Sequence, residues 1–271
     1  MSDHPDPVAG TARVNGIELH FEIGGDGPPL LLISGLGQHS GAWAGVLPRL
    51  RQRFRTLVFD NRGTGRSAVP PGPYPIDAMA DDAAALLEHL GIPVTAAVGW
   101  SLGGSVLQSM LIRHGRRLSA AVLLNAFPSY TELQHIWLDA LIALRRSDAS
   151  PEAKAAFAMP WGLTPLGLAD HALAMQGVRA AAADPYPTSH AAFEAQAAGL
   201  RVYDARPGLP TVKTPTLVLA GAEDVLTPVA QSAEIASLIP GARLHVMGKG
   251  GHRMIVEYPD EVLRLIDGFV R

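Results

Sequence analysis

The chain has 271 residues, of which 48% are hydrophobic and 17% charged, with a formal net charge of −3, which predicts a globular protein with a sizeable core. This charge provides no basic surface for nucleic acid or an acidic membrane, no apolar run approaches the ~18 residues of a membrane helix, and the lack of cysteine excludes disulfides and thiol chemistry. Because the first ten residues show no secretory signal, we expect a cytoplasmic protein.

The elements predicted along the chain alternate between strands and helices. A hairpin is predicted around Asn15-Gly16, with strands at 13–14 and 17–23. Six apolar strands are predicted at 30–33, 56–59, 95–98, 121–124, 216–220 and 243–247. Helices are predicted at 42–52, 76–90, 102–114, 229–238 and 259–270. This order predicts an α/β protein with a mostly parallel eight-stranded sheet and helices on both faces.

The alternation stops between Phe127 and Pro210, where residues rich in Ala, Leu and Met are interrupted by prolines. We expect about four short helices here, and we divide the chain into an α/β core at 1–126 and 207–271 and an inserted helical cap at 127–206. The alternative is that these helices pack elsewhere on the sheet. Six residues of the insert either line an apolar acyl pocket or form ordinary core: Trp137, Leu138, Leu141, Met159, Trp161 and Met175.

The sequence Gly-Trp-Ser-Leu-Gly at 99–103 joins a predicted strand to a predicted helix. A serine at such a sharp turn is held in strained backbone geometry with its hydroxyl above the sheet, and small residues at 99 and 103 let the turn close. We therefore predict that Ser101 is a nucleophile rather than an ordinary loop serine. The N–H of Leu102 lies at a helix N-terminus, where it can face a developing oxyanion.

A serine nucleophile needs a base to take its proton and an acid to orient that base. His252 follows a glycine-rich loop after the last predicted strand and is the best candidate base, with His39 as its rival. Asp224 follows the strand at 216–220 and is the candidate acid, with the adjacent Glu223 as the alternative.

A second oxyanion donor is expected in Ser-Gly-Leu-Gly at 34–37, after the first central strand, and we assign it to the N–H of Leu36. The glycine-rich residues 60–67 complete no phosphate-binding motif, so we interpret them as a hydrogen-bonded structural turn. No pair of histidines or carboxylates has metal-ligand spacing on one helix. We therefore predict neither a metal nor a cofactor.

With Ser101, Asp224 and His252 in this chain order, the sequence resembles the α/β-hydrolase superfamily over nearly its whole length. Residues 60–67 and the four-helix insert resemble the 3-oxoadipate enol-lactonase-like carboxylesterases, and the hexapeptide at 99–104 also occurs in pimeloyl-carrier-protein methyl esterases. The resemblance implies the roles of nucleophile, acid and base for these three residues. One departure is that Ser34 replaces the usual histidine of the oxyanion loop.

From these features we predict a serine hydrolase that cleaves a small carboxylic ester or lactone through an acyl-enzyme. Alternatives on the same fold are a C–C bond hydrolase, a thioesterase and an acyltransferase, and a non-catalytic ligand-binding module is the alternative from another class. The expected partner is a small-molecule ester, lactone or thioester. The sequence specifies neither the acyl and leaving groups nor an oligomeric state.

Overall fold

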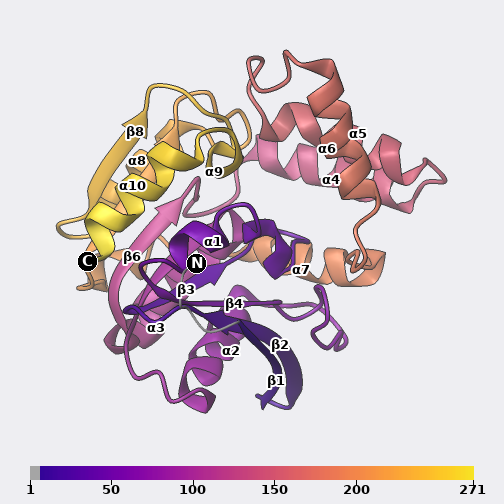
Figure 1. Cartoon of the computed structure of the whole chain (residues 1–271). Coiled ribbons are helices and arrows are strands. Elements are labelled where there is room, and N and C mark those ends of the chain that lie inside the picture. Colours follow the sequence, from indigo (N-terminus) through magenta and orange to yellow (C-terminus); the bar gives the residue numbers. More distant parts are fainter. Residues whose placement is uncertain (1–6) are drawn as a thin grey trace.

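The computed structural model describes residues 7–271. The first six residues, which belong to the predicted core and to the ten N-terminal residues considered for a secretory signal, lie outside the described residues. Its centre is an eight-stranded sheet with the order β1-β2-β4-β3-β5-β6-β7-β8 (Figure 1). β1 and β2 form the predicted hairpin, β2 pairs antiparallel with β4, and the other neighbours are parallel. The strands are β1 Val8–Val14, β2 Ile17–Gly24, β3 Pro29–Ile33, β4 Arg55–Phe59, β5 Thr95–Trp100, β6 Leu118–Leu124, β7 Thr216–Gly221 and β8 Arg243–Met247.

Helices cover both faces of this sheet, which explains why the central strands are apolar on both sides. One face packs against α2, α3 and α8, and the other against α1 and α10. The predicted α/β fold, with its mostly parallel sheet, is therefore confirmed. The helices are α1 Leu47–Leu50, α2 Ile76–His89, α3 Leu102–His114, α4 Glu132–Arg146, α5 Pro151–Gly162, α6 His171–Ala182, α7 His190–Val202, α8 Val229–Leu238, α9 Met254–Glu257 and α10 Pro259–Val270.

The continuous helix predicted at 42–52 is wrong. The structure has a 3₁₀ turn at Ser40–Trp43 and the single-turn helix α1, which begins four residues later. Pro48 explains the break, because inside a longer helix its ring would clash with the preceding turn and its missing N–H would remove a hydrogen bond. In the first turn of a helix, where Pro48 lies, proline costs little.

The predicted insert contains four helices, α4 to α7, between β6 and β7. Figure 1 shows α4, α5 and α6 as a lobe beside the sheet, whereas α7 contacts both α4 and the core helix α2. An isolated antiparallel bridge between Ser129 and Asp204 joins the two ends of the insert. The exact cap boundary at 127–206 stays a prediction.

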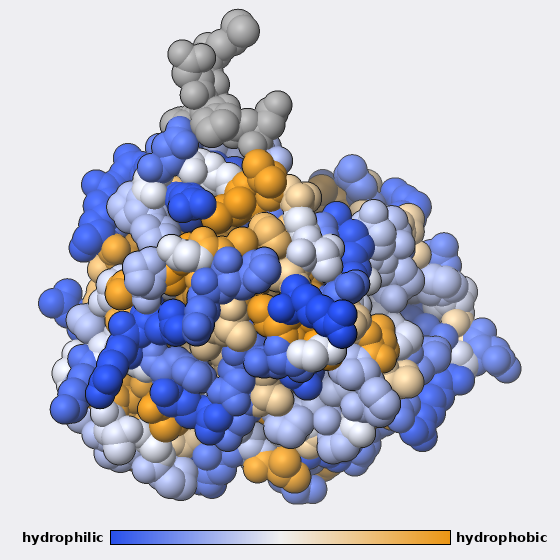
Figure 2. Space-filling model, turned by 90° about the horizontal axis from the view of Figure 1, so that it is seen from below, coloured by the Kyte–Doolittle hydropathy of each residue, from blue (hydrophilic) through white to orange (hydrophobic). Residues whose placement is uncertain are grey.

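The surface seen in Figure 2 shows separate apolar patches among hydrophilic side chains. The protein also carries ion pairs near its surface, including those of Arg113 with Asp81 and Arg146 with Glu194. Among residues 7–271, no helix is both long enough and apolar enough to cross a membrane.

Candidate active site

Ser101 lies in the turn between β5 and α3 with φ 56° and ψ −119°, a conformation that side-chain-bearing residues rarely adopt. A Cβ on Gly99 would lie 2.2 Å from the carbonyl oxygen of Gly103, and a Cβ on Gly103 would lie 2.1 Å from that of Ile33. Only glycine fits at either position. The geometry of the turn therefore depends on these two glycines, as the predicted nucleophile elbow requires.

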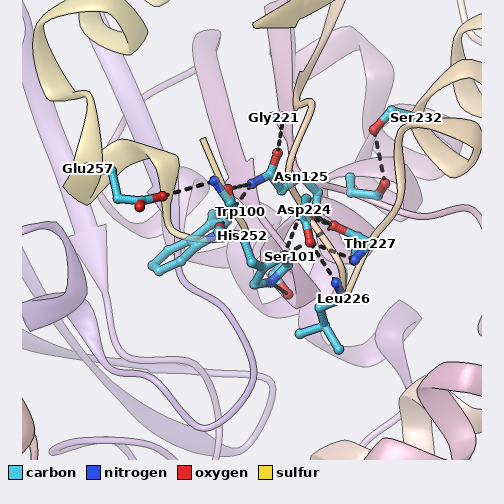
Figure 3. Close-up of polar contacts among 12 residues, drawn as sticks. Trp100, Ser101, Asn125, Gly221, Asp224, Leu226, Thr227, Ser232, His252 and Glu257 are labelled. Carbon is cyan, nitrogen blue, oxygen red and sulfur yellow. Dashed lines mark hydrogen bonds and ion pairs between the residues drawn. The ribbon is translucent and has the colours of Figure 1, made fainter. Parts of the chain in front are cut away.

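The three predicted triad residues form one hydrogen-bonded chain (Figure 3). His252 Nε2 lies 2.9 Å from Ser101 Oγ, and His252 Nδ1 lies 2.8 Å from Asp224 Oδ2. The imidazole is 8% exposed and the carboxylate is fully buried. The loops that follow β5, β7 and β8 supply the three residues, and parallel strands bring these loops to the same edge of the sheet.

The Asp224 carboxylate accepts hydrogen bonds from its own loop as well as from His252. The backbone N–H groups of Leu226 and Thr227 donate to Oδ1 over 2.9 and 2.8 Å, and the Thr227 hydroxyl donates to Oδ2 over 2.5 Å. These donors satisfy the buried oxygens of the carboxylate and hold it beside His252. Glu223 is exposed and accepts instead from the Gly250 N–H at 3.3 Å. The geometry therefore favours Asp224 over Glu223 as the acid.

His39, the rival base, engages both ring nitrogens away from Ser101. Its Nε2 lies 3.1 Å from Asp184 Oδ1, and its Nδ1 accepts from the Gly41 N–H at 3.0 Å. This second bond caps the 3₁₀ turn at Ser40–Trp43. His39 is therefore engaged in holding the loop, and His252 is the histidine that contacts the serine.

The two expected oxyanion donors lie on either side of Ser101, Leu36 in the loop after β3 and Leu102 at the first position of α3. A Cβ added to Gly35 would lie 3.5 Å from Ser101 Cβ, so the loop carrying Leu36 passes directly beside the serine. Within residues 7–271, the backbone N–H groups of Leu36 and Leu102 have no hydrogen-bond acceptor in the protein. Both are therefore available to an oxygen bound near Ser101, as the proposed oxyanion hole requires.

Ser34 supports the oxyanion loop in the place where the resemblance expects a histidine. Its buried hydroxyl accepts a hydrogen bond from the Trp43 indole at 3.0 Å and donates to the His39 carbonyl at 3.2 Å. Ser34 thus ties the loop that carries Leu36 to Trp43 and His39.

Gln196 and Asn125 are buried polar residues that sequence reasoning missed. Gln196, on α7, accepts from the Gly37 N–H at 2.9 Å and donates to the Arg62 carbonyl at 3.0 Å, which fixes the residue next to Leu36. Asn125 follows β6, and its amide donates to the carbonyls of Gly251 and His252 at 2.9 Å each. A polar residue directly after a buried apolar strand was the available signal for Asn125.

Two further sequence predictions concern the surroundings of the site. Residues 60–67 form the predicted structural turn, because the Asp60 carboxylate accepts from the N–H groups of Ser40 and Arg66. In the insert, Leu138 and Leu141 belong to a buried apolar cluster against which Leu36 packs. The interpretation of these insert residues as an acyl pocket stays a prediction.

Comparisons with known proteins identify the family to which the chain belongs. A family model described as the alpha/beta hydrolase fold matches residues 28–259, and the chain belongs to that family. A relative from Stutzerimonas stutzeri, named as a carbamate hydrolase, RutD, is 33% identical over 242 residues and covers 87% of this chain and 88% of its own length. The 3-oxoadipate enol-lactonase 2 of Acinetobacter baylyi is 28% identical over 263 residues and 96% of each chain.

Among solved structures, the enol-lactonase from Burkholderia xenovorans LB400 superposes with a TM-score of 0.86 and 27% identity, over 96% of this chain and 99% of its own. The fold is therefore shared over almost the entire length of both proteins.

Within residues 7–271, no three histidine, cysteine, aspartate or glutamate side chains gather in a way that could hold a metal ion.

Proposed function

We propose that the protein is a serine hydrolase that cleaves small carboxylic esters or lactones through an acyl-enzyme. The observation that carries the proposal is the buried hydrogen-bonded chain from Ser101 through His252 to Asp224. A strained elbow, an oriented imidazole and a buried carboxylate are the arrangement that turns a weakly nucleophilic hydroxyl into a nucleophile. An intact triad of this kind supports catalysis over the alternative of a ligand-binding module.

In the proposed reaction, Asp224 accepts the Nδ1 proton of His252 in a hydrogen bond, which leaves Nε2 free to take the proton of Ser101. Ser101 Oγ then attacks the substrate carbonyl, and the N–H groups of Leu36 and Leu102 stabilise the negative charge on its oxygen. His252 returns the proton to the leaving alkoxide. Water attacks the acyl-enzyme by the same steps and releases the acid.

The substrate class is supported by the names of the relatives. The enol-lactonases favour a cyclic ester, whose leaving alkoxide stays attached to the acyl group. The relative named as a carbamate hydrolase favours a second candidate, in which the attacked carbonyl bears a nitrogen. The same triad serves both reactions. We assign the choice between substrates to the insert at 127–206, which we propose to be a cap.

A substrate panel tests this proposal. It contains p-nitrophenyl esters, lactones, thioesters and carbamates, each assayed with the wild-type protein and with Ser101→Ala. We expect a burst of p-nitrophenolate from p-nitrophenyl acetate that is absent in the variant. Equal rates for the two proteins would contradict the proposal, and a preference for carbamates over matched esters would favour the second candidate.

A further inference from the structure

The carboxylate of Glu257, at the end of α9, joins two segments that are distant in sequence. Its Oε2 accepts from the N–H of Gly251, the residue before His252, at 2.9 Å. Its Oε1 accepts from the N–H and the hydroxyl of Thr164, in the insert, at 2.8 and 2.7 Å. Figure 3 shows Glu257 directed at the loop that carries His252. One side chain thus holds the insert and the histidine loop together.

The residue after His252 contacts the same part of the insert. The Arg253 N–H donates to the Gly162 carbonyl, the end of α5, over 2.7 Å. A Cβ on Gly162 would lie 2.7 Å from Arg253 Cδ, and one on Gly251 would lie 2.9 Å from the Gly162 carbonyl oxygen. Burial lowers the pKa of Arg253, and the nearby Glu257 charge acts in the opposite direction. Both neighbours of His252 are therefore packed against the insert.

We propose that Glu257 is a positioning residue that fixes the His252 ring relative to Ser101 by tying its loop to the insert. A carboxylate suits this position because it only accepts hydrogen bonds and here receives three donors, two of them backbone N–H groups that cannot reverse their role. This proposal rests on the proposed function, since it assigns His252 the role of base.

The link that Glu257 makes between the insert and the His252 loop has a consequence for the reaction rate. Misplacement of a catalytic group by about 1 Å can cost on the order of 100-fold in rate. If the Glu257 bonds keep His252 within reach of Ser101, their loss lowers kcat while leaving substrate binding nearly unchanged. The position of the insert thereby sets the activity of the base as well as the shape of the substrate site.

The test compares Glu257→Gln with Glu223→Gln. Glu223 accepts from the neighbouring Gly250 N–H in the same loop, and its side chain has no hydrogen bond to the insert within residues 7–271, which makes it a matched control. A glutamine at 257 retains one acceptor oxygen and places an NH₂ group against the remaining donor. Thr164→Ala removes the hydroxyl together with the methyl group, and Thr164→Ser keeps the hydroxyl without the methyl group. The measurements are kcat, KM, the rate of fluorophosphonate labelling at Ser101, and Tm.

For Glu257→Gln we expect kcat and the labelling rate to fall together by about 10- to 100-fold, with KM within about threefold. Glu223→Gln should match the wild type, and Thr164→Ser should restore whatever Thr164→Ala loses. The proposal is overturned if Glu257→Gln matches Glu223→Gln, or if its loss only follows the folded fraction given by Tm. A wild-type protein that is not labelled at Ser101 overturns the proposed function and this inference with it, a pattern distinct from selective failure at Glu257.

Discussion

The sheet-based core and the lobe of the insert differ in how firmly their residues are held. β5, which leads to Ser101, is buried throughout, and the three residues of the proposed triad are held by several hydrogen bonds. In the lobe, α5 buries only Met159 and Gly162, and α6 buries only Val178. The residues proposed for the chemistry are therefore held in the core, whereas α5 and α6 of the region to which we assign substrate choice bury few side chains.

α7 is the exception inside the insert. It is buried at seven positions, and its Gln196 is fully buried against the oxyanion loop. Its packing therefore makes it part of the core although the chain places it in the insert. Together with the Thr164 contact to Glu257, this gives the insert two attachments to the proposed machinery, one at the oxyanion loop and one at the base.

The largest effects are expected where the core supplies the reacting groups. Ser101→Ala and His252→Ala should each lower kcat by on the order of 10⁴ to 10⁶, because triad members act as a unit. Steady-state kinetics on the best ester or lactone measures this loss, and circular dichroism verifies that the variants are folded. A loss of less than tenfold in either variant would place the chemistry outside this chain of residues.

The acid should give the next largest effect. Asp224→Asn keeps the shape of the side chain but removes the charge that orients and stabilises the imidazole, so kcat should fall by on the order of 10³ to 10⁴. Glu223→Gln should stay close to the wild-type rate, well below a loss of about tenfold, since its exposed carboxylate accepts from the Gly250 N–H and not from His252. The two variants are assayed side by side. The reverse result, with Glu223→Gln the inactive variant, would move the acid by one residue.

A smaller effect is expected at the attachment between α7 and the oxyanion loop. Gln196→Met keeps the length of the side chain but leaves the Gly37 N–H without its acceptor, so the Leu36 donor shifts and kcat falls by about 10- to 100-fold. Gln134→Met is the control, because Gln134 is equally buried but bonds within the insert and to Gln231. Similar kinetics for the two variants would show that α7 does not support the oxyanion loop.

The smallest effect is expected for a substitution on the exposed face of the lobe. Leu173→Ala changes a side chain that is 61% exposed on α6, so the free energy of unfolding should change by less than about 0.5 kcal/mol. Leu32→Ala, at a fully buried position in β3, should cost about 2 to 5 kcal/mol. Urea denaturation of both variants measures the difference. Equal losses would contradict the contrast between the two regions.

Local sequence patterns predicted most of the fold, because buried parallel strands are continuously apolar and the elbow has glycines at two fixed positions. The helix expected at 42–52 was wrong because the prediction followed the apolar spacing and gave too little weight to Pro48. The partners of Gln196, Asn125 and Glu257 were not predictable in this way. Each of these residues bonds backbone groups more than 90 residues away, except for the contact of Glu257 with Gly251, and local spacing carries no information about such pairs.

Site-specific labelling tests whether Ser101 is the nucleophile activated by His252. The wild-type protein is treated with a fluorophosphonate probe, and the modified residue is located by mass spectrometry of the peptides. We expect one adduct per chain, at Ser101, because only this hydroxyl contacts the Nε2 of His252 within residues 7–271. Labelling should be greatly slowed in His252→Ala. Labelling at another serine, or labelling of Ser101 at an equal rate without His252, would contradict the account.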